Sequence, residues 1–249
     1  MFLAFVWWLR LFFFKIEGRL ENYLWVLNQA LVPLIGGING LFLSKKWGGW
    51  QSVIGRSLVF ISLGSLGWSF GDFVWSYFNL VEKIAIPYPS LADLGFFSMI
   101  PLWSLGMYFM IKAIGGKFAW RSLHGKIVVI VLPVLGFIVS YFLFLKGITL
   151  SGQFDWTKFL DIAYPLGDTM TITFALIAFG VSTRMLGGRM KLPILILILG
   201  FVAEYFADFS FSYGNSNGIY FNGSWIDLIY LTAQFLVVYG LANFESKDI

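Results

Sequence analysis

Residues 71–79 read GDFVWSYFN and residues 207–215 read ADFSFSYGN, and each stretch comes at the end of a long apolar segment. They share an aspartate, two aromatic positions, a serine, a tyrosine and an asparagine. About twenty residues later a second aspartate opens the next apolar segment, within SLAD at 90–93 and SWID at 224–227. The pattern predicts a duplicated helix hairpin whose repeated polar positions, Asp72 and Asp208, are carboxylates at membrane depth.

The composition is that of an integral membrane protein. Hydrophobic residues make up 59% of the 249-residue chain, charged residues make up 12%, and the mean hydropathy is +0.80. In a soluble domain about a quarter of the residues are charged. Aromatic residues reach 20%, which suits a lipid-facing surface with aromatic belts at both interfaces. The absence of cysteine excludes disulfides, thiolate metal sites and a cysteine nucleophile.

Seven segments are long enough to span a bilayer, whose hydrocarbon core of about 30 Å needs roughly 20 apolar residues per helix. They are 22–43, 53–79, 90–113, 125–146, 157–181, 191–213 and 224–244. We expect an all-α integral membrane protein, a seven-transmembrane-helix bundle over residues 22–249. In it the first segment is followed by three related hairpins, 53–113, 125–181 and 191–244. The middle hairpin matches least well, because Gly136 stands where the others have aspartate.

Residues 1–21 precede the first span. The stretch from Phe2 to Phe14 is apolar, but Arg10 interrupts it and it is short for a span. It lacks the basic leader and small-residue cleavage site of a signal peptide. We expect a helix that lies in the membrane interface, with Trp7 and Trp8 at headgroup level. The alternative is an eighth, partial or re-entrant span.

Basic residues predict the orientation. Most of them follow the first, third, fifth and last spans, namely Lys45, Lys46, Arg56, Lys112, Lys117, Arg121, Lys126, Arg184, Arg189, Lys191 and Lys247. By the positive-inside rule we expect a multi-pass protein of the cell membrane with its N-terminus outside and its C-terminus in the cytoplasm. Arg10, Lys15 and Arg19 argue mildly against this. The loops explain the net charge of +4, so the lipid bilayer is the expected partner and a nucleic acid is not.

Carboxylates fall almost entirely in the outer half under this topology. Ser90 with Asp93, and Ser224 with Asp227, match the capping box that starts a helix, which makes them structural caps. Four deeper acids have no such explanation, and they are Asp72, Asp168, Glu204 and Asp208. A charge at such depth costs about 2.5 to 3.5 kcal/mol and usually marks function. Glu204 and Asp208 are one helical turn apart, so we expect one of them to be protonated near neutral pH.

These acids predict an outward-open ligand cavity with aromatic walls. Its expected residues are Asp72, Asp168, Glu204 and Asp208 with Trp68, Trp75, Tyr77, Tyr164, Tyr213 and Tyr220. Carboxylates and aromatic faces favour a cation, above all an organic ammonium group. The alternative is a neutral hydrogen-bonded network of the acids with Tyr77, Tyr164, Tyr205, Tyr213 and buried serine and threonine.

Cofactors and metals are not expected. No spacing resembles a calcium-binding loop. The sole histidine, His124, lies in the loop between the 90–113 and 125–146 segments, away from the acids, so no Ser/His/Asp set can form. No lysine lies near the middle of the last segment, which argues against a retinal Schiff base.

The run PYPSLAD at 87–93, after WSY at 75–77, resembles a family of multi-helix membrane modules. These modules lie N-terminal to bacterial and archaeal histidine kinases and diguanylate cyclases. The stretches YPLGD at 164–168 and GSWID at 223–227 extend the resemblance over most of residues 53–244. The resemblance implies a sensor of a small signal. No kinase or cyclase domain precedes Ile249, so we expect the output to pass through a separate signalling protein or a homo-oligomer.

Three functions remain as hypotheses. The first is a stand-alone sensor or receptor, without enzymatic activity, that binds a small polar or cationic ligand in the acidic cavity. The second is a small proton- or cation-coupled transporter that uses Glu204 and Asp208. It ranks lower because 90–113, 157–181 and 224–244 become apolar toward the cytoplasm. The third is a membrane enzyme acting on a lipid or isoprenoid through an acid pair, for which no nucleophile is visible.

Overall fold

The computed structural model describes residues 1–84, 86–115, 130–131, 134–139, 141–142, 155–182 and 190–244, and secondary structure in these ranges is entirely helical. Within them, six helical stretches are long and apolar enough to cross a membrane. This agrees with a multi-pass membrane protein. Six of the seven expected spans correspond to these stretches, and the remaining one, 125–146, lies largely outside the described residues.

The observed helices begin and end within a few residues of the expected segments. Their bounds are α1 Phe2–Phe13, α2 Leu20–Gln29, α3 Leu31–Lys46, α4 Val53–Tyr77, α5 Leu91–Ala113, α7 Trp156–Ser182, α8 Lys191–Ser216 and α9 Trp225–Ala242. A short 3-10 turn, η1 Gly49–Gln51, precedes α4, and a π-helical turn, η2 Phe78–Glu82, extends it.

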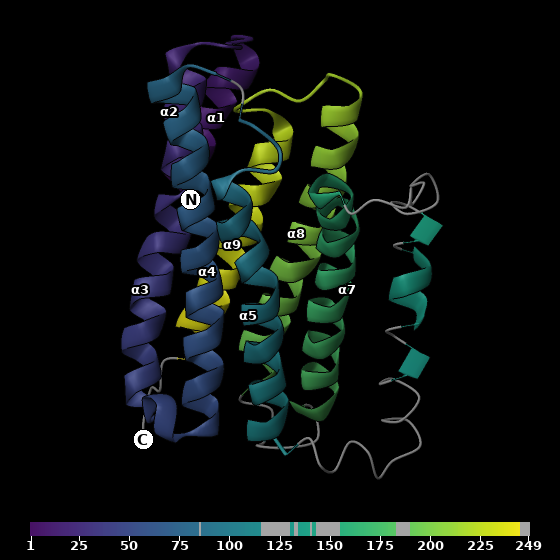
Figure 1. Cartoon of the computed structure of the whole chain (residues 1–249). Helices are drawn as coiled ribbons and strands as arrows, with labels where there is room; N and C mark the ends of the chain where they lie inside the picture. Colours follow the sequence, from purple (N-terminus) through teal and green to yellow (C-terminus); the bar gives the residue numbers. More distant parts are fainter. Residues whose placement is uncertain are drawn as a thin grey trace.

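The helices form a closed ring in chain order. α3 packs against α4, α4 against α5, α5 against α7, α7 against α8 and α8 against α9, and α9 returns to α3. They stand roughly parallel as an elongated bundle (Figure 1). The end at which α5, α7 and α9 begin, uppermost in Figure 1, is the acidic end. The opposite end, which carries Lys45, Lys46 and Lys191, is the basic end.

Proline breaks the first span into two helices. Pro33 has no amide hydrogen for the carbonyl of Gln29, four residues earlier, and its ring would clash with that carbonyl. α2 accordingly ends at Gln29 and α3 begins two residues later. The carbonyl of Ala30, at the break, accepts a hydrogen bond of 2.8 Å from the hydroxyl of Ser69 on α4. The same carbonyl also accepts from the Leu34 amide at 3.2 Å, so the Ser69 hydrogen bond ties α4 to the break and does not replace the one that Pro33 removes at Gln29.

The N-terminal helix α1 packs against the bundle. It stands beside α2 at the acidic end (Figure 1). The Trp8 indole donates to the carbonyl of Ser224 at 3.1 Å, and the Trp25 indole on α2 donates to the carbonyl of Ala4 at 2.9 Å. Residues 1–21 were expected to form a separate interfacial segment with Trp8 at headgroup level. Trp8 is buried against the bundle, so α1 is not a separate segment, and the expected boundary at residue 21 falls inside α2.

Two serines, Ser90 and Ser224, start the second helix of each outer hairpin, α5 and α9. The Ser90 hydroxyl accepts from the Ala92 amide, and the Asp93 carboxylate accepts from the Ser90 amide at 2.6 Å, so the capping box of α5 is complete. At α9, Ser224 accepts from the Ile226 amide, and Asp227 accepts from the amide of Gly223, one residue before the cap. Both serine caps place an aspartate in the first turn, where the helix dipole favours negative charge.

The middle hairpin lacks this arrangement. Pro165 lies inside α7, so Asp168, three residues later, lies in the interior of that helix and not in its first turn. Gly136, at the position without an aspartate, lies against the side chain of Thr169 on α7. The local geometry of Asp168 therefore differs from that of Asp93 and Asp227.

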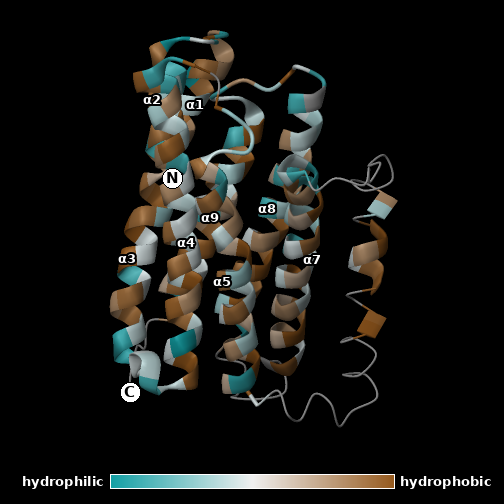
Figure 2. Ribbon diagram, viewed as in Figure 1, coloured by the Kyte–Doolittle hydropathy of each residue, from teal (hydrophilic) through white to brown (hydrophobic). Residues whose placement is uncertain are grey.

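Apolar residues fill the ring toward the basic end. Below Glu204 along α8, the side chains of Phe201, Leu197 and Ile194 follow at successive turns, and all three are buried. The Phe201 ring lies 5.0 Å from that of Trp103 on α5. Figure 2 shows hydrophobic residues along the middle of the helices, with hydrophilic residues gathered toward the ends. The buried carboxyl groups thus lie from Glu204 toward the acidic end, whereas the polar residues buried toward the basic end are serines and threonines such as Ser57, Ser62 and Thr173.

Candidate functional site: a buried carboxyl cluster

Glu204 of α8 lies at the centre of a buried hydrogen-bonded group. The indole nitrogen of Trp68 on α4 donates to one carboxyl oxygen at 2.8 Å, and the amide of Gln234 on α9 donates to the other at 3.0 Å. Glu204 is 1% exposed. Two consecutive helices, α8 and α9, and the distant α4 therefore meet at one carboxyl group.

A second pair of acids lies one turn nearer the acidic end. The Tyr230 hydroxyl on α9 donates to Asp208 of α8 at 2.6 Å. Asp168 of α7, which is 4% exposed, brings its carboxyl group within hydrogen-bonding reach of Asp208. Two carboxyl groups can share such a contact only if one of them carries a proton or a cation lies between them. Glu204 and Asp208 were expected to form this pair, and Asp168 joins it as a third member.

The remaining members are Asp72 and Asp227. Asp227 accepts hydrogen bonds from the Tyr220 hydroxyl at 3.1 Å and from the Gly223 amide at 2.5 Å. Asp72 of α4 lies close enough to Asp227 for their charges to interact, and both are buried. Burial, and then the charge of Asp227, raise the pKa of Tyr220 well above its usual value. Tyr220 therefore stays protonated and keeps its donated hydrogen bond.

The carboxyl cluster, meaning Asp72, Asp168, Glu204, Asp208 and Asp227, has no basic partner among the described residues. The ion pair found in the described part of the chain joins Arg10 to Glu21 at 3.1 Å and is exposed. One oxygen of Asp72, of Asp168 and of Asp208 is buried without a hydrogen-bond partner. Buried polar atoms are rarely left unpaired, so each of these oxygens indicates a place for a proton or another positive group.

Residues expected in the site fall into two groups. Trp68 contacts the cluster directly, as described above. The Tyr164 hydroxyl of α7 donates to the cap residue Asp93 at 3.1 Å and so links the beginnings of α7 and α5. The contacts of the described residues join none of the other three expected aromatic residues, Trp75, Tyr77 and Tyr213, to a member of the carboxyl cluster. The Tyr77 hydroxyl donates to Glu82 at 2.7 Å, and Tyr77 and Tyr213 are 50% and 57% exposed.

A second tyrosine also ties α5 to α7. The Tyr88 hydroxyl, in the segment before α5, donates to Asp161 at 2.9 Å. Burial, and then the charge of Asp161, raise the pKa of Tyr88, which keeps this hydroxyl protonated. Together with the hydrogen bond from Tyr164 to Asp93, this contact closes the acidic end of the ring between α5 and α7.

Two donors to the cluster were not foreseen. Tyr230 and Gln234 lie three and seven residues after Asp227 in α9, so all three share one face of that helix. This polar stripe within an apolar helix is visible in the sequence. The acids that it meets lie on α8, and only the rotation of the two helices decides that contact.

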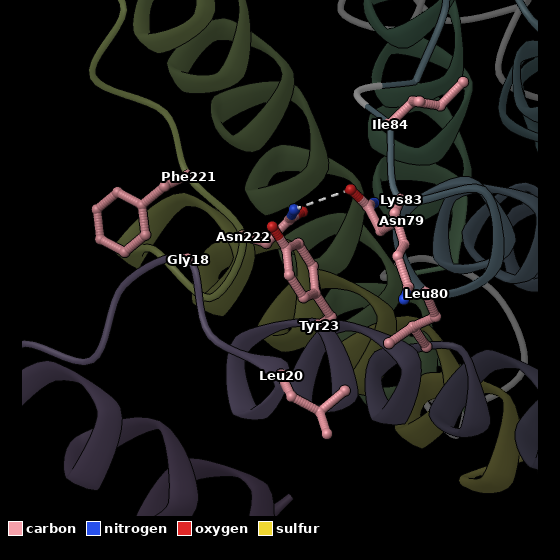
Figure 3. Close-up of a pocket in the computed structure, with 9 residues that line it drawn as sticks. All are labelled: Gly18, Leu20, Tyr23, Asn79, Leu80, Lys83, Ile84, Phe221 and Asn222. Atoms are coloured by element: carbon pink, nitrogen blue, oxygen red, sulfur yellow. Dashed lines mark hydrogen bonds between the residues drawn. The ribbon is translucent and has the colours of Figure 1, made fainter.

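An open pocket lies at the acidic end, beyond the cluster. It has a volume of about 550 Å³, and its polar lining comes from Tyr23, Asn79, Lys83 and Asn222 (Figure 3). Asn222 accepts from the Trp75 indole at 2.9 Å and donates to Asn79 at 3.4 Å. The Tyr220 hydroxyl lies 3.4 Å from the same Asn222 oxygen. Asn222 thus stands between the pocket and the Tyr220 hydroxyl that contacts Asp227.

A metal centre is not indicated in the ranges that the structure covers. There, no group of three or more histidine, cysteine, aspartate or glutamate residues has the geometry to hold a metal ion. Comparison with known proteins gives no match, because no family model, no curated protein and no solved structure is significantly similar to this chain.

Proposed function

We propose that this protein is a membrane receptor or sensor that binds a small cation from the acidic end at its carboxyl cluster, a proton being the smallest such ligand. The observation that carries the proposal is the set of buried carboxyl oxygens without partners on Asp72, Asp168 and Asp208, in a region with no basic side chain among the described residues. A bound proton or cation would lower the free energy of such a site, because it would compensate buried oxygens that have no hydrogen-bond donor. Aromatic rings around Trp68 and Tyr230 would add cation–π attraction for an ammonium group.

The sensor role also draws on the resemblance at residues 87–93 and on the paired positions in the two outer hairpins. Trp68 and Glu204, which hydrogen-bond to each other, each lie four residues before a repeated aspartate. Two related hairpins that meet around a central site would bring equivalent positions together, and Trp68 and Glu204 are such a pair. In this proposal the signal passes to a separate partner protein or a second copy.

A proton- or cation-coupled transporter is the second candidate, because the contact between Asp168 and Asp208 could carry a proton. Transport requires a route to the other side of the membrane. Below Glu204 the ring interior holds Phe201, Leu197 and Ile194, which offer no polar step. Of the buried hydroxyl groups in that half, Ser57 donates to the Gly106 carbonyl at 2.7 Å, and Ser104 and Thr171 form a hydroxyl pair at 2.8 Å that contains no titratable group. A carboxyl cluster that is followed mainly by apolar side chains toward the basic end suits a receptor better than a transporter.

The proposal predicts that Asp168→Asn removes the need for a cation. At pH 8 the wild type holds two carboxyl groups in contact, whereas the variant holds one carboxyl and one amide that can donate to it. We expect the variant to gain about 1 kcal/mol in free energy of unfolding at pH 8 and to lose any stabilisation by added tetramethylammonium or sodium. The measurement is the thermal midpoint in neutral detergent as each cation is titrated.

Asp155→Asn is the matched control. Asp155 is exposed at the start of α7 and accepts from the Thr157 amide at 2.9 Å, which asparagine can also do. This variant removes the same charge and should behave as the wild type. If the wild type showed no saturable cation response, or if Asp168→Asn kept it, the receptor proposal would be wrong.

For orientation we propose that the basic end faces the cytoplasm, since Lys45, Lys46 and Lys191 lie there. The chain contains no cysteine, so single-cysteine variants report one position each. In intact cells an impermeant maleimide should label Asn217→Cys, between α8 and α9. It should label Lys46→Cys only after the membrane is permeabilised. The reverse pattern would invert the assignment.

A further inference from the structure

We propose that the pocket at the acidic end binds the anionic headgroup, a phosphate or carboxylate, of a membrane amphiphile, with Lys83 as the charged contact. The pocket is distinct from the carboxyl cluster, and this inference does not depend on cation binding there. It stands on the donors that line the pocket, its depth in the membrane, and the backbone conformation of Lys83.

The lining presents hydrogen-bond donors and one positive charge, and no carboxylate. Two carboxamides, of Asn79 and Asn222, lie side by side in the lining and are hydrogen-bonded to each other, with the Tyr23 hydroxyl next to Asn222 and the Lys83 side chain beside Leu80 (Figure 3). One amide hydrogen of Asn79 is given to the Trp75 carbonyl at 3.0 Å, which leaves the second amide hydrogen for a ligand. Asparagine amides, a tyrosine hydroxyl and an ammonium group can all donate to an anionic oxygen. A cation would find no charged partner in this lining.

Two neighbouring acids, Glu82 and Glu21, have other partners, and Glu17, which precedes the lining residue Gly18, is exposed. Glu82, which precedes Lys83, accepts the hydroxyl hydrogen of Tyr77 and does not line the pocket. Glu21 on α2 is paired with Arg10. Within the described residues Lys83 has no carboxylate partner, so its charge is available to a ligand.

The depth of the pocket indicates an amphiphile. The candidate membrane span formed by α4 and η2 ends at Glu82, and we place the adjacent Lys83 at the level of the lipid headgroups, where lysines that follow a span are expected. The other side of the lining is apolar, with Leu20, Leu80, Ile84 and Phe221. Leu20 is 63% exposed and Ile84 is 51% exposed, which leaves an apolar rim beside the charged group. A polar head held by Lys83 and a chain lying along this rim would cover both surfaces.

The backbone at Lys83 gives an independent reason. Its φ is +56°, in the left-handed region that glycine and asparagine adopt most readily. Lysine is a costly choice for this turn, and such strain is often retained where a side chain has a task. We infer that this turn keeps a lysine because its ammonium group contacts the ligand in the pocket.

Dodecyl phosphate added to the protein in dodecyl maltoside is the probe. We expect a saturable rise of about 3 °C in the thermal midpoint of the wild type. Inorganic phosphate at the same concentration should give no rise. Lys83→Gln should weaken the apparent affinity at least tenfold. Lys83→Gly should lose the response as well, while its midpoint without the probe equals or exceeds that of the wild type because the turn is relieved.

Lys15 supplies the matched control. It is a lysine with a φ of +48°, it is exposed in the connection between α1 and α2, and it does not line the pocket. Lys15→Gln and Lys15→Gly should keep the full response. Equal loss in the Lys15 variants would assign the effect to general surface charge. A response to inorganic phosphate alone would make this a free-anion site, and an unchanged response in both Lys83 variants would remove the site altogether. Each of these outcomes overturns the proposal.

Discussion

Replacing Glu204 by leucine is expected to lower the free energy of unfolding by about 2 to 5 kcal/mol, whereas replacing it by glutamine is expected to cost less than about 1 kcal/mol. Leucine would leave the indole of Trp68 and the amide of Gln234 buried without an acceptor, and each such loss costs about 1 to 3 kcal/mol. Equilibrium unfolding in mixed micelles, followed by tryptophan fluorescence, measures both changes.

Glutamine is tolerated for a specific reason. The glutamine carbonyl can still accept from Trp68. The carbonyl oxygen of Gln234 has no hydrogen-bond partner in the wild type, and after a rotation of the Gln234 amide it can accept from the new amide group at position 204. Glu17→Leu is the control, since Glu17 is exposed and the substitution should change stability little. If Glu204→Leu were as stable as Glu204→Gln, the hydrogen bonds at Glu204 would not hold the three helices together.

Most of the spans could be predicted from hydropathy and length, because a bilayer imposes both on any helix that crosses it. Serine caps at 90 and 224 also identified where α5 and α9 begin. The break after Gln29 has a visible cause in Pro33, although the first span was expected to be continuous. What could not be predicted is the position of α1, because Trp8 bonds to a carbonyl 216 residues away.

The candidate site was foreseen in its acids and less well in their partners. Depth along a helix follows from residue number, which is why Asp72, Asp168, Glu204 and Asp208 could be named. The pairs of acids that come into contact are decided by the rotation of each helix and by the order of the helices in the ring. The periodicity of one helix predicts neither the rotation nor the order. The contact of Asp168 with Asp208, and the outward direction of Tyr77, belong to this second class.

The position of Asp72 depends on the approach of α4 to α5, so the second large effect is expected at Gly95. A Cβ atom built on Gly95 would lie 2.5 Å from the nitrogen of Gly71 and 2.6 Å from the carbonyl oxygen of Gly67, both backbone atoms of α4. Backbone cannot rotate away as a side chain can. We expect Gly95→Ala to cost about 1 to 3 kcal/mol in free energy of unfolding and Gly95→Leu at least about 3 kcal/mol.

Gly180→Ala is the control, because a Cβ atom on Gly180 would meet no described residue within 4 Å and the variant should lose no stability. If Gly95→Leu were as stable as this control, α4 and α5 would not be in backbone contact. The milder Gly95→Ala also tests the site. Gly71 directly precedes Asp72, so pushing α4 outward withdraws the Asp72 carboxyl from Asp227. The rise in the thermal midpoint on adding cation should therefore be smaller in Gly95→Ala than in the wild type, and unchanged in Gly180→Ala. Both variants are measured under conditions in which Gly95→Ala is still folded.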